Sequence, residues 1–188
     1  IATNSNDILH RCISRNDYSK QDLQHSLSPS MDIMVSSNFE RLLFDLYAHN
    51  GGEITRLMSE FESGAMQLDE SALASAREVF ASFSMKDDAM LQTIHDVYQQ
   101  SEYLLDPHTA IGVAAARTLR NNVETPMICL ATAHPAKFPE AIQTVMPELT
   151  PALPLHMRDL FERAEAFEVL PNDLGVIHSH MLQCLAER

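Results

Sequence analysis

The chain has 188 residues, of which 45% are hydrophobic and 21% are charged, and its formal net charge is −13. This composition is typical of a globular protein with a buried core, and it excludes wholesale disorder. The excess of acidic over basic residues excludes a nucleic-acid-binding surface, because contact with phosphates needs clustered cations. No apolar run approaches the ~20 residues of a membrane-spanning helix. We therefore expect a cytoplasmic protein that has neither nucleic acid nor a membrane as a partner.

The first part of the chain combines the end of a strand, a long loop and one helix. The step from Ile1-Ala2 to polar residues is typical of a strand end, and residues 16–35 are polar enough to form a loop. Long loops in compact domains are commonly functional. An amphipathic helix is predicted after the cap residues Ser37 and Asn38. Because the chain does not begin with Met, we expect it to be part of a longer protein.

Residues 51–101 show helical periodicity after the break at Gly51-Gly52. Their apolar residues recur at spacings of three and four, which places them on one face of a helix. Three short helices are predicted, with the apolar faces Ile54, Leu57, Met58 and Phe61; Leu73, Val79, Phe80 and Phe83; and Met90, Leu91, Ile94, Val97 and Tyr98. Asp87 and Asp88 favour the start of the third helix, because the helix dipole favours acids in the first turn.

The rest of the chain alternates helices with short apolar segments. Residues 107–120 are predicted to form a helix that has Pro107 in its first turn. Residues 127–132 are a continuous apolar run, typical of a strand buried on both faces of a parallel sheet. A helix is predicted over 138–145, a strand over 167–170 and a last helix from 172 onward. This alternation predicts an α/β fold with an incomplete parallel sheet flanked by helices.

Four polar clusters are candidates for a site. Residues 132–137 follow the predicted buried strand, and open α/β sheets bind ligands beyond the carboxyl ends of their strands. The other clusters are Asp106-Pro107-His108-Thr109, residues 3–7 and residues 28–33. A structural alternative exists, since a hydroxyl or Asp106 can simply cap the next helix. The nine histidines show no metal-binding spacing, so no metal site is predicted.

Together these clusters resemble threonine synthase of the longer bacterial and fungal type. The matching segments, which follow the family's order, are Ala2-Thr3-Asn4-Ser5-Asn6-Asp7, Ser28-Pro29-Ser30-Met31-Asp32-Ile33, Ser37-Asn38-Phe39-Glu40-Arg41-Leu42, Leu105-Asp106-Pro107-His108-Thr109-Ala110 and Leu130-Ala131-Thr132-Ala133-His134-Pro135-Ala136-Lys137-Phe138. The last segment is the most specific, and residues 139–188 match only loosely.

The resemblance implies the C-terminal part of a pyridoxal 5′-phosphate (PLP) enzyme of fold type II, the fold of the tryptophan synthase β-subunit. Members of the family convert O-phospho-L-homoserine and water to L-threonine and phosphate by elimination and replacement. The implied organisation has three parts. Residues 1–50 and 102–146 would belong to the PLP-binding α/β domain, 51–101 to a helical insertion, and 147–188 to a C-terminal strand and helix extension.

The resemblance also assigns candidate site residues. The family has a hydroxyl beside the PLP pyridine nitrogen, and Thr132 holds that motif position, so Thr132 is the expected cofactor-binding residue. The substrate-binding candidates are Asn6, Asp7, Ser30, Asp32, Asn38, Arg41, His108, His134 and Lys137. A substrate that carries phosphate and carboxylate groups needs cationic partners, which Arg41 and Lys137 would supply. For each candidate, a purely structural role is the alternative.

The family's PLP lysine and its PLP-phosphate loop lie upstream of these segments, so no catalytic residue is assigned in this chain. Lys137 lies in the most specific segment, but its position is not that of the PLP lysine. We therefore expect the N-terminal half of the same protein as a partner, and the chain alone to be inactive. Two alternatives remain: a threonine synthase-like lyase with another phosphorylated substrate, and a non-catalytic α/β ligand-binding or interaction domain.

Overall fold

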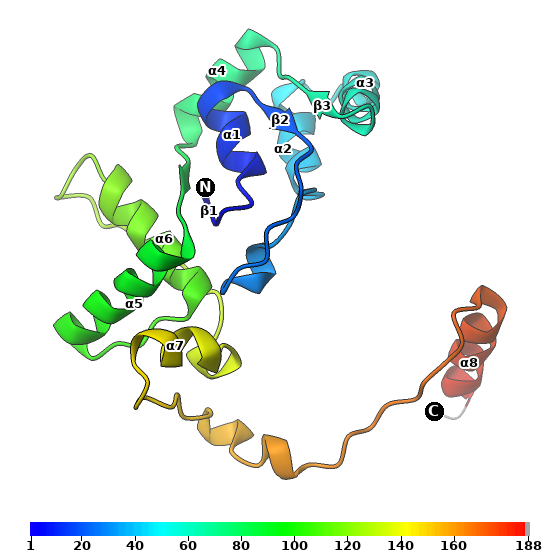
Figure 1. Cartoon of the computed structure of the whole chain (residues 1–188). Coiled ribbons are helices and arrows are strands. Elements are labelled where there is room, and N and C mark those ends of the chain that lie inside the picture. The colour runs from blue at the N-terminus through cyan, green and yellow to red at the C-terminus, as the bar shows by residue number, and fades with distance from the viewer. Residues whose placement is uncertain (187–188) are drawn as a thin grey trace. The chain divides into compact units, whose positions relative to one another are not determined.

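The computed structural model describes residues 1–186 and is built mainly of helices and loops (Figure 1). The chain divides into two compact units, one ending at Ala152 and the other beginning at Leu153. Throughout residues 1–186, every helix is too short or too polar to cross a membrane.

The first unit contains four short strands and most of the helices. Its elements are β1 (Ala2–Thr3), α1 (Ile8–Arg15), β2 (Tyr18–Ser19), the 3-10 turn η1 (Pro29–Met31), α2 (Phe39–Leu46), α3 (Gly51–Glu62), β3 (Ala65–Met66), α4 (Glu70–Val79), β4 (Phe83–Ser84), α5 (Asp87–Ser101), α6 (Pro107–Leu119), the 3-10 turn η2 (Pro135–Lys137) and α7 (Pro139–Val145). The second unit contains two 3-10 turns (Leu155–Met157 and Leu160–Glu162) and α8 (Leu174–Ala186).

The strands form two small sheets. β1 and β4 pair in parallel, with Thr3 opposite Ser84, whereas β2 and β3 pair antiparallel, with Tyr18 opposite Met66. The helix-rich fold with a small parallel sheet confirms the predicted α/β class. One expectation at this sheet was wrong: Phe83 lies in β4 and not on a helix face, because the main chain after α4 is extended and pairs with β1.

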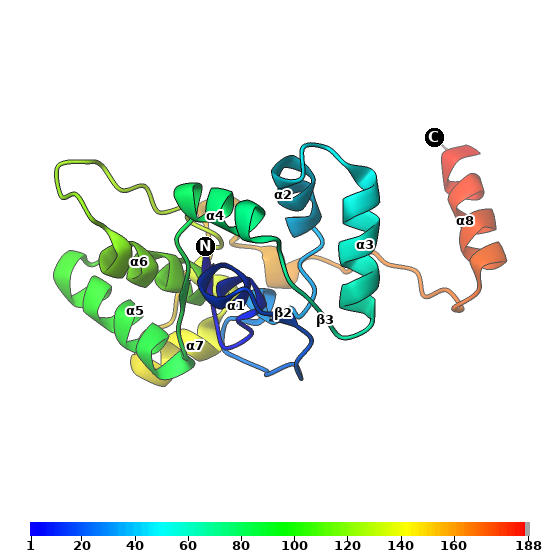
Figure 2. The ribbon, with the colours of Figure 1, turned by 90° about the horizontal axis from the view of Figure 1, so that it is seen from above.

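The first hydrophobic core joins helices α1 to α4. The ring of Tyr18 stacks on Phe39 at a centroid distance of 5.4 Å and lies 4.9 Å from the ring of Phe61. Leu43 of α2 and Leu57 of α3 are fully buried in the same cluster. The two helices lie side by side in Figure 2. The spacing of apolar residues in the sequence predicts this buried face of α3.

The second hydrophobic core joins α5, α6 and α7. Met90 and Ile94 of α5, Ile111 of α6 and Ile142 of α7 are fully buried in it. The axes of α5 and α6 run side by side in Figure 1 and Figure 2. Leu105, which precedes α6, is buried in the same cluster. This core therefore fixes the position of the first turn of α6, where the candidate site lies.

Every helix predicted from the sequence is confirmed. Local capping explains two of the boundaries. The Asn50 side chain accepts hydrogen bonds from the N–H groups of Gly52 and Glu53 at the start of α3. At the start of α5, Asp87 and Asp88 lie in the first turn, where the helix dipole favours them.

Two predicted strands are wrong. Residues 127–132 and 167–170 form no strand, and their apolar side chains are exposed, with Ile128 and Leu130 at 82% and Val169 at 81%. A strand in the middle of a parallel sheet needs a hydrogen-bonded neighbour on each side and helices over both faces. Within residues 1–186 neither segment has such a neighbour, so an apolar sequence alone does not make it a strand.

Candidate functional site around Asp106 and Thr132

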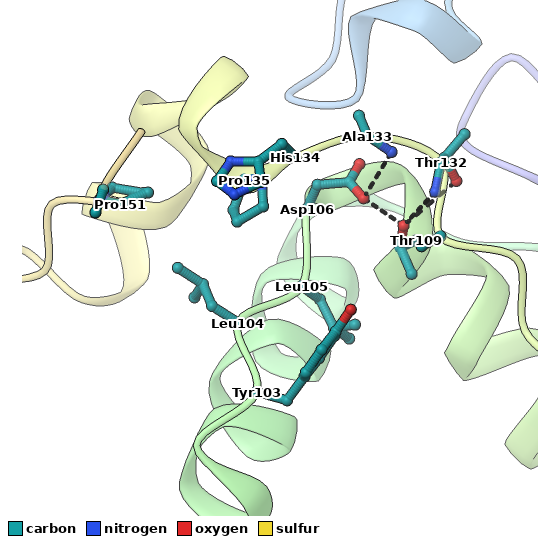
Figure 3. Close-up of a pocket in the computed structure, with 12 residues that line it drawn as sticks. Tyr103, Leu104, Leu105, Asp106, Thr109, Thr132, Ala133, His134, Pro135 and Pro151 are labelled. Carbon is teal, nitrogen blue, oxygen red and sulfur yellow. Dashed lines mark hydrogen bonds between the residues drawn. The ribbon is translucent and has the colours of Figure 1, made fainter. Parts of the chain in front are cut away.

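The site is built on the first turn of α6. Asp106 caps the helix, because its carboxylate accepts the N–H of His108 at 3.0 Å, and Pro107 suits the first turn because it lacks an N–H group. Asp106, His108 and Thr109 are all buried. Figure 3 shows Asp106 and Thr109 of this turn facing Thr132 and Ala133, which belong to the segment before η2.

Both carboxylate oxygens of Asp106 have partners beyond the helix cap. Oδ1 lies 2.9 Å from Nδ1 of His108. Oδ2 accepts the hydroxyl proton of Thr109 and, at 3.3 Å, the N–H of Ala133. Burial alone would raise the pKa of Asp106, but the hydrogen bonds from His108 and Thr109 outweigh burial and hold the pKa below its ordinary value. Asp106 is therefore an ionised acceptor at neutral pH.

His108 connects this carboxylate to the loop of residues 28–33. Its Nε2 accepts the backbone N–H of Ser30 at 3.1 Å. An imidazole nitrogen that accepts a hydrogen bond carries no proton, so the neutral ring has its proton on Nδ1, which then donates to Asp106. The ring of Phe138 packs against the imidazole at a centroid distance of 4.5 Å. His108 is thus held from three sides.

Thr132 is held by Thr109 at the wall of a cavity. The backbone N–H of Thr132 donates to Oγ1 of Thr109 at 2.9 Å. The two hydroxyl oxygens are 3.4 Å apart, beyond the usual range for two hydroxyls. Thr132 is exposed and lines a cavity of about 560 Å³ together with Asp106 and His134. Its hydroxyl proton is therefore free to be donated into this cavity.

A second polar network fixes residues 24–32 against the strand β1. Oδ1 of Asp32 accepts from the amide of Asn4 at 2.7 Å, from the amide of Asn6 at 3.0 Å and from the hydroxyl of Ser26 at 2.6 Å. Oδ2 of Asp32 accepts the N–H of Ser26 at 2.9 Å. Asn6 also exchanges two hydrogen bonds with the backbone of Gln24. The polar atoms of Asn6 and Asp32 are thus engaged within the loop, which favours the structural alternative for both residues.

The remaining substrate-binding candidates are spread more widely. Asp7 is paired with the buried guanidinium of Arg11 at 2.9 Å. Asn38 and Arg41 are exposed at the start of α2, whose buried side chains belong to the first core and not to the core beneath the site. His134 caps η2, since its Nδ1 accepts the N–H of Ala136 at 3.2 Å.

Lys137 follows His134 in η2, and its ammonium lies 5.5 Å from the ring centroid of Phe138. Four of the matching segments thus meet around α6 and β1, whereas the segment with Asn38 and Arg41 lies apart. The substrate-binding roles of all these residues stay predictions. Within residues 1–186, no three His, Cys, Asp or Glu side chains come together in a way that could hold a metal ion.

Sequence reasoning did not single out Thr109, Asn4 or Ser26, although the first two lie inside matching segments. Asp106 was expected only as a helix cap, which it is, but it also holds Thr109 and Ala133. The contact with Ala133 has no signal in the sequence, because it joins residues that are far apart along the chain. The Thr109 contact has one local indication, because Thr lies three residues after the expected cap residue Asp106.

Solved structures define the class of this fold. The chain is similar to a PLP-bound threonine synthase from Brucella melitensis, with a TM-score of 0.89 and 40% identity over 97% of this chain and 39% of that chain. It is also similar to threonine synthase from yeast, with a TM-score of 0.85 and 30% identity over 100% of this chain and 42% of that chain. The fold is therefore the helix-rich C-terminal portion of a PLP fold type II enzyme.

Sequence comparison leads to the particular family. Residues 109–181 match the family model described as "Threonine synthase, C-terminal". The chain is 51% identical to the threonine synthase of Pseudomonas aeruginosa over 184 residues, which is 97% of this chain and 39% of that relative. The chain belongs to the threonine synthase family. It spans about two fifths of the length of the curated relatives it matches.

Proposed function

We propose that the chain is the C-terminal part of a PLP-dependent threonine synthase, which converts O-phospho-L-homoserine and water to L-threonine and phosphate. The observation that carries the proposal is the position of Thr132, whose backbone N–H is held through Thr109 and Asp106 and which lines a large cavity. The family of the chain supports the proposal. The substrate and product are small water-soluble metabolites, so we also place the reaction in the cytoplasm.

The residues present fit the cofactor at its pyridine nitrogen. That nitrogen is a hydrogen-bond acceptor, and Thr132 offers a hydroxyl proton that no residue of the network requires. When bound, PLP supplies an electron sink for proton loss and phosphate loss from the substrate. A neutral hydroxyl would bind the nitrogen without forcing a proton onto it, as a carboxylate would. Asp106 does not compete for this place, because its oxygens are engaged by His108, Thr109 and Ala133.

The chain's cations would serve the anionic substrate. Lys137 lies near the cavity wall formed by His134 and Pro135, and a phosphate or carboxylate group is best held by such a charge. Arg41 lies in α2, so it could bind the same substrate only if the substrate extended to that helix. Neither residue forms an ion pair with an acidic side chain among residues 1–186, so each charge is available for a ligand.

The proposal requires a partner for this chain. No lysine is among the residues that line the cavity in the described part of the chain. We propose that the lysine that binds PLP is supplied by the N-terminal half of the same protein, which would also pair with residues 126–131. The chain alone is then expected to be inactive.

Phosphate release from O-phospho-L-homoserine, with PLP added, tests the proposal. We expect release by the longer protein and none by the 188-residue chain. In the longer protein, Thr132→Val should weaken PLP binding and slow release, whereas Thr132→Ser keeps the hydroxyl and should retain both. Release from a different phosphorylated substrate alone would indicate a threonine synthase-like lyase. A longer protein that binds no PLP would favour the non-catalytic binding domain and overturn the proposal.

A further inference from the structure

A continuous chain of hydrogen bonds runs from the loop of residues 28–33 to Thr132. It begins at the backbone N–H of Ser30, which donates to Nε2 of His108 at 3.1 Å. It continues from Nδ1 of His108 to Oδ1 of Asp106 at 2.9 Å. Oδ2 of Asp106 binds the Thr109 hydroxyl, whose oxygen accepts the N–H of Thr132 at 2.9 Å. The three middle residues are buried and lie in one turn of α6.

Each step of this chain has only one possible direction. The Ser30 N–H can only donate, so Nε2 of His108 must accept, and the ring proton must be on Nδ1. The ionised carboxylate of Asp106 can only accept, so it takes the ring proton on one oxygen and the Thr109 hydroxyl proton on the other. Thr109 has then no proton left for Thr132. Any hydrogen bond across the 3.4 Å between the two hydroxyl oxygens would therefore be donated by Thr132. At this separation the bond is weak, so the Thr132 hydroxyl can turn to a better acceptor in the cavity, which is the role that the cofactor nitrogen needs.

We propose that Thr109 and Asp106 are positioning residues that act through Thr132, and that His108 ties this arrangement to the loop of residues 28–33. The inference rests on the proposed function for the role of Thr132 and goes beyond it in assigning the residues behind it. None of the three is expected to touch the reacting atoms. Their effect is to fix where the Thr132 hydroxyl lies and to keep its proton free.

Thr109 offers the sharpest test, because Val keeps the shape of Thr without its hydroxyl, whereas Ser keeps the hydroxyl without the methyl group. Thr109→Val removes the hydroxyl and leaves the Thr132 N–H without an acceptor, whereas Thr109→Ser keeps the hydroxyl. In the longer protein with PLP, Thr109→Val should weaken PLP binding about tenfold, as the loss of one well-placed hydrogen bond does. It should lower kcat by up to about 100-fold with a smaller change in KM. Thr109→Ser should restore both values to within about threefold of wild type.

A double-mutant cycle decides whether Thr109 acts through Thr132. If it does, the roughly tenfold effect of Thr109→Val on the PLP dissociation constant should shrink to less than about twofold when Thr132 is already Val. Spectrophotometric titration with PLP measures this constant without any substrate. An undiminished effect of Thr109→Val in the Thr132→Val protein would overturn the positioning role.

Hydrogen–deuterium exchange of the longer protein without PLP tests the arrangement independently of any activity. Thr109→Val should speed exchange at Thr132 and leave the peptide that covers α1 unchanged. His108→Phe keeps a ring against Phe138 but cannot accept from Ser30, so it should speed exchange at Ser30 and, to a lesser extent, at Thr132. An effect of His108→Phe at Ser30 alone would overturn the link to the loop.

These readouts separate failure of the inference from failure of the proposed function. If the wild-type longer protein binds no PLP and releases no phosphate, the proposed function fails, and the exchange experiment still decides whether Thr109 holds Thr132. If the wild type is active but Thr109→Val leaves PLP binding, kcat and exchange at Thr132 unchanged, the proposed function stands and the positioning role is overturned.

Discussion

The first turn of α6 and residues 126–131 differ in how many of their groups are buried or hydrogen-bonded within this chain. In the first turn of α6, Asp106, His108 and Thr109 are buried and all their side-chain polar groups have partners. Residues 126–131 make no backbone–backbone hydrogen bond within residues 1–186, and Ile128 and Leu130 are exposed. One side of the site thus has its polar groups satisfied within this chain, whereas the adjoining apolar segment has neither backbone partners nor cover within residues 1–186.

The largest effect on stability is expected where the network is complete. Asp106→Ala leaves the groups of His108, Thr109 and Ala133 without their acceptor. Because each buried donor left unpaired costs about 1–3 kcal/mol, the free energy of unfolding should fall by about 3 kcal/mol or more. Asp22→Ala is the control, since Asp22 is exposed in a loop, and it should leave stability unchanged. Equal denaturation midpoints for the two variants in urea would show that the network contributes nothing.

A matched pair of isoleucines compares the two regions directly. Ile111 of α6 is 0% exposed, whereas Ile128 is 82% exposed. In the 188-residue chain, Ile111→Ala should reduce the free energy of unfolding by about 2–5 kcal/mol, because it leaves a cavity in the second core. Ile128→Ala should change it by less than about 0.5 kcal/mol. In the longer protein both substitutions should be costly, and a harmless Ile128→Ala there would mean that this segment has no partner.

The loss of stability at low pH is expected to be a smaller effect, and the pKa shift of Asp106 sets its direction. The pKa of Asp106 is lowered in the folded chain, so as pH falls the unfolded chain takes up the proton first. The stabilisation is present above about pH 4, the ordinary value for Asp, and is lost as the pH falls through the folded-state pKa. Asp106→Asn should therefore flatten the loss of stability in this range. Asp17, whose pKa is also lowered, keeps some acid sensitivity in the variant.

Local signals in the sequence were sufficient for helices α2 to α8 and for the cap of α6, whereas α1 was not predicted. Apolar spacing predicts α3 and α5, and Asp106-Pro107 predicts the start of α6, because these features depend on residues within one or two turns. The sequence was insufficient for residues 127–132. Their apolar run indicates a segment suited to burial, but it does not show whether neighbouring strands are present to form hydrogen bonds with it.

The candidate site shows the same division. The resemblance led to Thr132 and His108, but it did not identify Thr109 as the residue that holds Thr132. That contact joins the first turn of α6 to a segment that lies beyond the end of this helix in the sequence. Only the folded chain brings the two together. Asn4 and Ser26 are likewise defined by their bonds to Asp32 and not by any local pattern.

Alkylation of Cys129 in the native protein tests most directly whether residues 126–131 have a partner in the longer protein. Cys129 is exposed in this chain, as is Cys184, whereas burial raises the pKa of the Cys12 thiol to about 12 and shields it from reagents. We expect iodoacetamide to modify Cys129 rapidly in the 188-residue chain and slowly in the longer protein, with Cys12 unreactive in both until they unfold. Rapid modification of Cys129 in both proteins would contradict the account, because residues 126–131 would then lack a partner in the longer protein.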